Sequence, residues 1–477
     1  MFVAEALSVP LMPSASKGAL QAFSMISTDS RKIQPGALFV AIQGEKFDGH
    51  EFIGDVIKKG AWGILCRRDF KIAEPKGLHI FPVENPLNAY RRLAGHWRKQ
   101  FSVPVIAVAG SVGKTSTKEL LTAALRGRFG EVLRTQGSQN GFVGIPMTLL
   151  ELRPSHEVAV VEVGIDEPGT MEQHMALVAP TTSVLTTIGP EHLEKLRDVP
   201  TVAREEGIAL TSVAQSGGTI AVNLDDPWIR PHFNTLKTAR KIGYTLDRNR
   251  ANTYATDLIL IGSFSDSGTL SVSHPDLGEC SFKPPLPGRH NALNLMAAIA
   301  VSIAVGLTFD QIKKGLKTFE PPDGRSELRE FSDGTQVVCD YYNANPDSME
   351  AGLELLTDIA RKKSGKSKKL NTRWACLADM LELGPDEDRF HRELAGPLMR
   401  LKIENILLFG PRMKSLRDEL SNRGFQGSVD HFEKQSELTS RLISGVHSGD
   451  AILIKGSHSM KMEDVWKKLR GSRPEKS

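Results

Sequence analysis

A short apolar run followed by a glycine-rich turn constrains the fold of this chain more than any other feature. The run VIAVAG begins at Val105, and the turn Gly110–Ser116 leads into TKELLTAALRGRF, which has the pattern of a helix. A continuously apolar run is typical of a parallel strand buried on both faces. Glycines let backbone N–H groups turn inward around phosphate oxygens, and a helix N-terminus adds its positive dipole end. The segment therefore predicts a phosphate-binding loop.

The spacing of this loop is the shorter GxxGKT form. The common GxxxxGK[ST] pattern requires a glycine at position 108, where the chain has Val108. In such a loop Lys114 supplies a point charge to the terminal phosphates, and Thr115 offers a hydroxyl to Mg²⁺. A glycine turn that precedes a helix by chance is the alternative. The residues expected to bind the phosphates are Gly110, Ser111, Val112, Gly113, Lys114, Thr115 and Ser116.

Short apolar strands alternate with helical stretches over most of the sequence, and 477 residues are too many for one ordinary core. We expect an α/β fold of three domains. We expect residues 1–102 to form a small N-terminal α/β domain, and residues 103–321 a central phosphate-binding domain with the phosphate loop and a doubly wound parallel sheet. Residues 322–477 form a C-terminal Rossmann-like α/β domain, entered through the FEPPDGR stretch.

Bulk composition restricts the class of protein. The net charge of +4 is small for this length and the basic residues are dispersed, which gives no argument for nucleic-acid or membrane binding. No stretch approaches the roughly 20 apolar residues of a membrane span, and residues 1–16 lack a signal-peptide pattern. The cysteines are isolated, which suits a reducing compartment. We expect a cytoplasmic protein, and a monomer.

Two ionisable residues follow predicted strands of the central domain. Glu162 ends the apolar run AVVEV, and an ionised group in a parallel-sheet core is costly unless it is paired or metal-bound. We therefore assign Glu162 to Mg²⁺, with a structural salt bridge as the alternative. His192 lies just past the run TTSVLTTIG. A lone histidine is more often structural, but a position after a strand of the same sheet favours a ligand, because parallel strands present functional groups at their carboxyl ends.

These three segments together resemble the ATP and metal motifs of the Mur ligase family. The loop at 110–116, Glu162 in VEVG and His192 in PEHLE carry the resemblance. It implies that Lys114 and Thr115 hold phosphates and Mg²⁺, and that Glu162 and His192 are magnesium ligands. The implied cofactors are ATP and Mg²⁺.

The chain departs from the family at one position of this site. Members typically carry a carbamylated lysine shortly after the histidine, whereas this chain has VAREEGIAL, with Glu206 at the corresponding place. We hypothesise that Glu206 supplies directly the carboxylate that a carbamate otherwise provides. An acid on the helix surface is the alternative.

The resemblance extends over nearly the whole chain. GRHNALN at 288–294 implies that Asn291 contacts the nucleotide base. Arg325 in DGRSE is similar to a family arginine that reaches the ATP phosphates, and Asp340 resembles an aspartate on the ATP ribose. The third domain would then close over ATP held by the second.

Four stretches resemble one branch of the family, which joins D-alanyl-D-alanine to UDP-N-acetylmuramoyl-tripeptide. They are QGSQNGFVGIPMTLL (136–150), DYYNANPDSM (340–349), ADMLELG (378–384) with His391, and KGSHSMKMEDV (455–465). The chain departs from the branch pattern at Ser138, Gly141 and His458. The substrate contacts that the stretches imply are Asn140, Asn343, Asn345, Asp379, His391 and Lys455.

The N-terminal segment 26–53 resembles the domain that binds the uridine diphosphate end of the precursor. Ser30 and Arg31 are the expected contacts, followed by Gly44 and residues 48–50. A small structural domain is the alternative for this segment.

The reaction implied by the resemblance activates a carboxylate as an acyl phosphate and joins it to an amine. Its product is the UDP-N-acetylmuramoyl-pentapeptide of peptidoglycan synthesis, with ADP and phosphate released. Two alternatives remain open: another Mur-type or folylpolyglutamate-type amide ligase, and a nucleotide-binding regulator without catalysis. The expected catalytic residues are Lys114, Glu162, His192 and Glu206.

Overall fold

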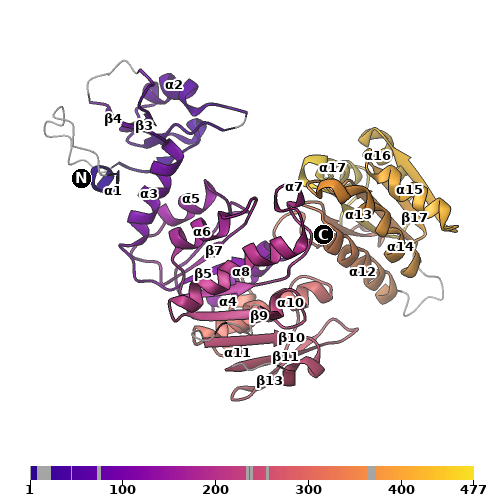
Figure 1. Ribbon diagram of the computed structural model, residues 1–477. Coiled ribbons are helices and arrows are strands. Elements are labelled where there is room, and N and C mark those ends of the chain that lie inside the picture. The colour runs from indigo at the N-terminus through magenta and orange to yellow at the C-terminus, as the bar shows by residue number, and fades with distance from the viewer. Residues whose placement is uncertain are drawn as a thin grey trace.

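The computed structural model describes residues 2–7, 23–44, 46–71, 77–231, 236, 240–253, 257–363 and 372–476. Most of residues 1–16, where we expect no signal peptide, lie outside these ranges. The described residues form three sheets that follow one another along the chain, and the lobe built on the second sheet lies between the other two (Figure 1). The three-domain α/β architecture is therefore confirmed.

The N-terminal lobe contains a parallel sheet in the order β1-β2-β3-β4. Its strands are β1 (Ile26–Ser27), β2 (Leu38–Val40), β3 (Gly63–Arg67) and β4 (His79–Val83). Its helical segments are α1 (Phe2–Leu7), η1 (Ser30–Lys32), η2 (Gly49–Phe52), α2 (Ile53–Lys58) and α3 (Pro86–Arg98). The Asn85 side chain caps α3 by accepting the Asn88 N–H, which satisfies one of the free donors at a helix start.

Helix α3 also joins this lobe to the central one. The Trp97 indole donates to the Leu152 carbonyl at 3.1 Å, and the Arg98 guanidinium donates to the Val178 carbonyl at 3.1 Å. Both acceptors belong to the central lobe, so the end of α3 is fixed against it.

The central sheet has the strand order β13-β12-β11-β10-β9-β8-β5-β7-β6. Pairing is parallel from β6 to β11, and β12 and β13 add an antiparallel edge that the sequence reading does not include. The strands are β5 (Val105–Ala109), β6 (Val132–Arg134), β7 (Val158–Glu162), β8 (Thr182–Leu185), β9 (Thr219–Asn223), β10 (Arg240–Thr245), β11 (Leu258–Phe264), β12 (Leu270–His274) and β13 (Gly278–Phe282). The chain leaves β5 towards β6 and β7 and later returns to its other side with β8, so the strand order reverses at β5, where α/β sheets bind ligands.

Both faces of this sheet are covered by helices, as its apolar strands require. Along β5, Val105, Ala107 and Ala109 join one buried cluster, whereas Ile106 and Val108 join another. This alternation explains why the run is continuously apolar. The helices are α4 (Lys114–Leu125), α5 (Gly144–Leu150), α6 (Thr170–Val178), α7 (Leu193–Leu196), α8 (Val199–Gln215), α10 (Arg289–Ala304) and α11 (Phe309–Leu316).

The C-terminal lobe holds a third sheet in the order β14-β15-β19-β16-β17-β18, antiparallel only between β14 and β15. Its strands are β14 (Glu327–Glu330), β15 (Gln336–Asp340), β16 (Arg373–Ala378), β17 (Asn405–Phe409), β18 (Ser428–Phe432) and β19 (Ala451–Lys455). Its helical segments are α12 (Pro346–Lys363), η5 (Gly384–Asp386), α13 (Glu387–Glu393), α14 (Ala395–Arg400), α15 (Met413–Asn422), α16 (Gln435–Gly445), η6 (His458–Met460) and α17 (Glu463–Gly471).

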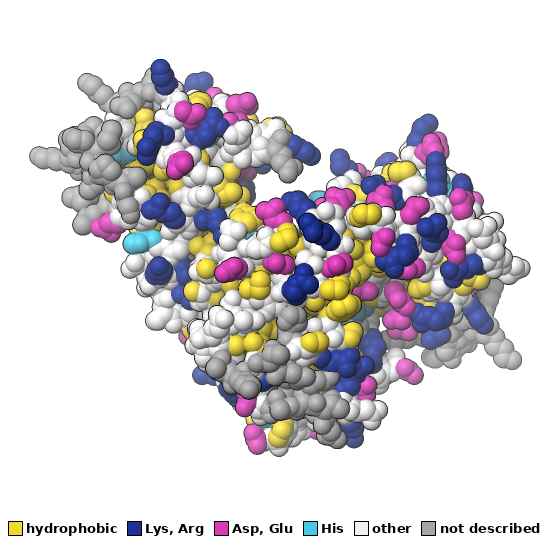
Figure 2. All heavy atoms as spheres, viewed as in Figure 1, with side chains coloured by type: hydrophobic (Ala, Val, Ile, Leu, Met, Phe, Trp, Pro, Cys, Tyr) yellow, Lys and Arg dark blue, Asp and Glu magenta, His cyan; other side chains and the backbone are white. Residues whose placement is uncertain are grey.

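The surface agrees with the small net charge. On the face shown in Figure 2, Lys and Arg side chains are interspersed with Asp and Glu rather than gathered into a patch of one sign. Among the helices of the described residues, none combines the length and apolar character needed to cross a membrane.

Candidate active site

The phosphate loop occupies the carboxyl end of β5, and two of its glycines are sterically required. Gly110 and Gly113 have φ values of 120° and 89°, a region that side chains with a Cβ rarely adopt. A Cβ on Gly110 would lie 2.3 Å from Thr186 Oγ1, and one on Gly113 would lie 2.3 Å from Asn294 Oδ1. Helix α4 starts at Lys114 with no side-chain cap, so its first N–H groups remain available to an anion.

Lys114 lies among acidic groups at the start of α4. Its ammonium donates to the Gly110 carbonyl and to Glu191 Oε2, the latter at 3.3 Å. Burial opposes its charge, but the carboxylates of Glu191, Glu206 and Glu162 raise its pKa above the ordinary value. Lys114 therefore keeps its positive charge at neutral pH, as a group that binds phosphate must.

Thr115 and Glu162 meet beside the loop. The Thr115 hydroxyl donates to Glu162 Oε1 at 3.0 Å, and the Asn140 amide donates to the same oxygen at 2.8 Å. Glu162 is 1% exposed, and its Oε2 has no hydrogen-bond partner. Buried oxygen ligands of this kind fit Mg²⁺, which proteins bind through one or two carboxylates together with waters and substrate phosphates.

Glu206 lies on α8 and is fully buried, so the alternative of a surface acid is wrong. Its Oε2 accepts the Gly110 N–H at 2.8 Å, while its Oε1 has no partner. Burial, aided by the neighbouring carboxylate of Glu191 and opposed by Lys114, raises the pKa of Glu206 to about 8. The side chain thus contacts the backbone of the phosphate loop.

His192 points towards the C-terminal lobe. Its Nδ1 lies 2.6 Å from Glu382 Oε2. Burial works to lower the pKa of His192, but the Glu382 and Glu191 carboxylates outweigh it and raise the pKa. No cluster of three or more His, Cys, Asp or Glu side chains suited to a metal occurs within the described ranges, so Glu162, His192 and Glu206 do not form a ready-made ligand set.

Of the two predicted nucleotide contacts of the C-terminal lobe, Arg325 reaches this site, whereas Asp340 is held by Lys455 of its own lobe. Arg325 donates to Ser138 Oγ at 2.9 Å, and Ser138 Oγ lies 3.1 Å from Thr115 Oγ1. Burial works to raise the pKa of Asp340, but the Lys455 ammonium at 2.6 Å lowers it below the ordinary value. Lys455 also donates to the Asn343 carbonyl at 3.0 Å, so the structure brings Asp340, Asn343 and Lys455 together.

Asn291 lies at the start of α10 and is 1% exposed. Its amide nitrogen donates to the Pro287 carbonyl at 2.8 Å, and its oxygen accepts from Asn294 at 3.1 Å. The adjacent Asn294 is the group that crowds Gly113, so this amide pair borders the phosphate loop.

Three predicted substrate contacts use their polar atoms within the C-terminal lobe. Asn345 Oδ1 accepts the Ser348 N–H, which starts α12. Asp379 Oδ1 accepts the Met413 N–H at the start of α15. His391 is fully buried, and its Nε2 accepts the Met380 N–H. These bonds hold the turns around the sheet edge in place.

Of the contacts predicted in the N-terminal lobe, Arg31 and Gly44 are exposed and Ser30 is half-buried, whereas His50 is buried with its Nδ1 2.5 Å from Asp48 Oδ1. The Arg31 side chain is 87% exposed and binds both carboxylate oxygens of Asp29 at 2.9 Å. That hydrogen-bonded pair lowers the pKa of Asp29 to about 2. Ser30 accepts from Lys59 through its carbonyl, and the Gly44 N–H donates to the Phe47 carbonyl.

Three residues of the site escape the sequence reading. Glu191 binds Lys114, Lys118 is buried beside Glu162, and Glu382 pairs with His192. A signal exists for two of them: Glu191 directly precedes His192, and Lys118 lies one helical turn after Lys114, on the same face of α4. Nothing local marks Glu382, because its partner is almost 200 positions away in the chain.

A glycine-lined phosphate loop at the reversal point of a parallel sheet, faced by a second α/β lobe, is the arrangement of a three-domain protein that binds a phosphate-bearing ligand. Family models of ligase domains match most of the chain's length. The Mur ligase family catalytic domain matches residues 22–100, the Mur ligase middle domain residues 108–302, and the Mur ligase glutamate ligase domain residues 324–458. The chain belongs to the Mur ligase family.

Curated relatives align over nearly the whole chain. The UDP-N-acetylmuramoyl-tripeptide--D-alanyl-D-alanine ligase of Escherichia coli (strain K12) is 30% identical over 456 residues, covering 95% of each protein. The enzyme of the same name from Bacillus subtilis (strain 168) is 29% identical, over 93% of this chain and 92% of the relative.

Solved structures share the fold. MurF from Acinetobacter baumannii superimposes with a TM-score of 0.83 at 24% identity, covering 98% of both chains. MurF ligase from Thermotoga maritima, in complex with ADP, gives a TM-score of 0.77 at 23% identity, over 94% of this chain and 98% of that one.

Proposed function

We propose that this chain adds D-alanyl-D-alanine to UDP-N-acetylmuramoyl-tripeptide in the cytoplasm, with ATP and Mg²⁺, in peptidoglycan synthesis. The relatives from Escherichia coli and Bacillus subtilis carry this activity in their names. The observation that carries the proposal is the pairing of Thr115 with Glu162 at 3.0 Å beside a charged Lys114. We also propose domain limits of 1–102, 103–321 and 322–477.

The chemistry requires positive charge where Lys114 lies. The attack of a substrate carboxylate on the γ-phosphate brings two anions together, so the barrier falls when fixed cations offset the repulsion. The raised pKa of Lys114 keeps its ammonium available for the phosphates. Thr115 and Glu162 would hold Mg²⁺, which supplies further positive charge to the phosphate oxygens when bound.

The second half-reaction needs a closed site. An acyl phosphate hydrolyses if water reaches it before the amine does, so lobes that meet over the site protect it. Arg325 reaches Ser138 from the C-terminal lobe, and Glu382 reaches His192. We assign Arg325 to the ATP phosphates, Asp340 to the ribose and Asn291 to the base.

Glu206 fits the role of a built-in carboxylate, because a cation bound beside it would offset the burial that raises its pKa to about 8. It is buried, and it binds the Gly110 N–H of the phosphate loop at 2.8 Å. Its Oε1 has no hydrogen-bond partner, and we assign this oxygen to Mg²⁺ when the nucleotide is bound. We assign His192 to the same site, together with Lys114 and Glu162.

The substrates would bind at the two outer lobes. We assign the uridine diphosphate end to the N-terminal lobe, where Arg31 is exposed. The acceptor end lies between the central and C-terminal lobes. The residues assigned to the substrates are Ser30, Arg31, Gly44, Asn140, Asn343, Asn345, Asp379, His391 and Lys455.

The test is an assay of ADP release with the purified chain, ATP, Mg²⁺ and UDP-N-acetylmuramoyl-tripeptide. We expect ADP to form only when D-alanyl-D-alanine is also present, and D-alanine alone to be a poor acceptor. Preference for a single amino acid would point instead to another amide ligase of the family. ADP release that no acceptor stimulates would favour a nucleotide-binding regulator and contradict the proposal.

A further inference from the structure

A row of alternating charges runs through the central lobe towards Glu162. Arg134 Nη1 lies 2.9 Å from Glu119 Oε1, which lies 2.9 Å from Lys118 Nζ, and Lys118 Nζ lies 3.6 Å from Glu162 Oε2. The exposed side-chain fractions are 25% for Arg134 and 13% for Glu119, but 0% for Lys118 and 1% for Glu162. The row therefore begins at the surface and ends in the buried site.

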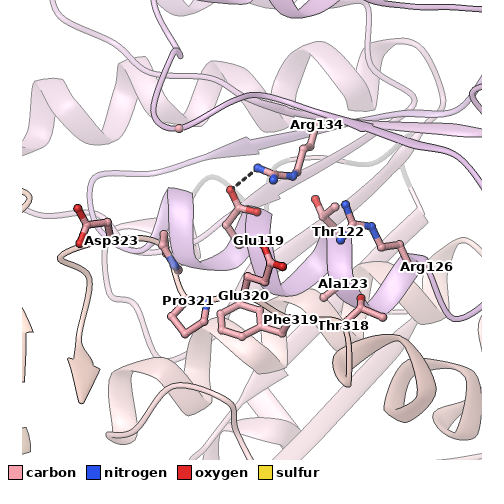
Figure 3. A pocket seen from close by; sticks show the side chains of 12 residues that line it. Glu119, Thr122, Ala123, Arg126, Arg134, Thr318, Phe319, Glu320, Pro321 and Asp323 are labelled. Atoms are coloured by element: carbon pink, nitrogen blue, oxygen red, sulfur yellow. Dashed lines mark hydrogen bonds and ion pairs between the residues drawn. The ribbon is translucent and has the colours of Figure 1, made fainter. Parts of the chain in front are cut away.

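The outer end of the row lies at a pocket beside the connection to the C-terminal lobe. Figure 3 shows Glu119 joined to Arg134 above the segment 318–323, which lines the same pocket. Glu119 comes from α4 and Arg134 from β6. The next member of the row, Lys118, directly precedes Glu119 on α4 and is therefore one position nearer the phosphate loop.

Lys118 is held by backbone as well as by carboxylates. Its ammonium donates to the Thr135 carbonyl at 2.8 Å and to the Gly137 carbonyl. Its contacts with Glu119 at 2.9 Å and with Glu162 at 3.6 Å are ion pairs. A buried ammonium is costly unless it is paired in this way.

The segment that Lys118 anchors carries the groups that orient Glu162. The Thr135 hydroxyl accepts the Glu162 N–H at 3.0 Å. Further along the segment, Asn140 donates to Glu162 Oε1 at 2.8 Å. With Asn140 and Thr115 on Oε1 and Lys118 facing Oε2, both oxygens of the carboxylate are fixed in direction.

We propose that Lys118 is a positioning residue for the magnesium–nucleotide site. It holds the segment 135–140 against α4 and sets the direction of the Glu162 carboxylate, without touching the nucleotide itself. The inference rests on the proposed function in one respect, which is that Glu162 serves a Mg²⁺ ion bound with ATP.

The first test compares nucleotide binding by Lys118→Met with and without Mg²⁺. A non-hydrolysable ATP analogue is titrated by calorimetry in excess Mg²⁺ and again in EDTA. We expect Lys118→Met to lose about tenfold or more of its affinity in Mg²⁺, the loss typical when a residue that orients a ligand is removed. Its affinity in EDTA stays near that of the parent. An equal loss of affinity in Mg²⁺ and in EDTA would overturn the proposal, because a general structural defect would weaken nucleotide binding in both conditions.

The matched control is Glu119→Gln, which removes the other acid paired with Lys118 but leaves both carbonyl contacts and Glu162. We expect a smaller change in the Mg²⁺ titration than for Lys118→Met. If Glu119→Gln loses as much nucleotide affinity in Mg²⁺ as Lys118→Met, the effect comes from the whole row of charges and not from the contact between Lys118 and Glu162. That result would contradict the role assigned to Lys118.

The second test asks whether Lys118 acts through Glu162. In a Glu162→Gln background, Lys118→Met is expected to cause no further loss of Mg²⁺-dependent affinity, because the group that it orients no longer carries charge. A full additional loss would show that Lys118 acts elsewhere.

A folding failure is also informative. If Lys118→Met does not fold, the double variant Lys118→Met/Glu162→Gln should, because it leaves no unpaired buried charge. Failure of the double variant to fold would assign Lys118 a general structural role and overturn the proposal. If the parent chain binds no nucleotide in either condition, the proposed function itself fails, and the inference fails with it.

Discussion

The imidazole Nδ1 of His192 lies 2.6 Å from Glu382 Oε2, and this ion pair joins the central lobe to the C-terminal lobe. Both residues have left-handed backbones, with φ of 48° and 65°. Such conformations cost about 1–3 kcal/mol each in non-glycine residues and persist where the surroundings enforce them. Beside them, α7 and η5 pack so closely that a Cβ on Gly384 would lie 3.1 Å from the Leu193 carbonyl carbon. The backbone conformation of each lobe therefore holds its residue in position for this contact.

This pair predicts a pH effect. Glu382 raises the pKa of His192, so the pair stabilises the fold fully below the ordinary value of 6.5, and the contribution is lost as pH rises through the raised pKa. We expect Glu382→Gln to lower the pKa of His192, measured by NMR titration of its ring protons. The control Glu194→Gln removes a charge from the adjacent helix and should leave that pKa raised. An unchanged His192 titration in Glu382→Gln would contradict the pairing.

Gly113 predicts a steric requirement. Gly113→Ala would place a Cβ 2.3 Å from Asn294 Oδ1 on a backbone with φ of 89°. We expect a loss of stability of about 1–3 kcal/mol by denaturant unfolding, together with loss of nucleotide binding.

The matched control for this substitution is Gly169→Ala. It has a similar φ of 81° but no atom within 4 Å of its Cβ, so it should cost only about 1 kcal/mol and leave binding intact. Equal nucleotide affinity in both variants would show that the loop tolerates the side chain.

If Glu206 takes the place of a carbamylated lysine, the activity of the enzyme should not depend on carbon dioxide. Because the carboxylate is built into the chain, added bicarbonate should not change the rate of the parent enzyme. Glu206→Gln should reduce turnover about tenfold or more at limiting Mg²⁺, and bicarbonate should not restore it. Glu205→Gln is the control, because the Glu205 carboxylate binds the Gly169 N–H rather than the loop. Full activity of Glu206→Gln at low Mg²⁺ would remove Glu206 from the site.

The parts of the fold that are local in sequence were predictable. The apolar run before Gly110 identifies β5, and the glycines with Lys114 identify the loop, because strand burial and turn conformation leave direct traces in residue order. The position of Glu162 at the end of a strand is predictable for the same reason, because a charged residue closes the apolar run of β7. Its role as a metal ligand stays a prediction. The sequence analysis does not include the antiparallel edge, although the turn at 275–277 between two short polar–apolar alternations is a hairpin signal.

Contacts between residues that are far apart in the sequence were not predictable. Lys118 looks like an ordinary helix lysine until the segment at 135–137 packs over it. Glu382 finds its partner only when the lobes meet. Asp379 and His391 stand in a recognisable motif, yet their hydrogen bonds inside the lobe appear only in three dimensions.

The most direct test of the account is the rate of acceptor-dependent ADP release by Lys114→Met, with the exposed-lysine variant Lys195→Met as control. Because Lys114 is the fixed cation of the phosphate loop, we expect its replacement to reduce the rate by at least about a hundredfold while the protein remains folded. Lys195→Met should retain the parent rate. A Lys114→Met enzyme that turns over as fast as the parent would contradict the assignment of this loop to the phosphates of ATP.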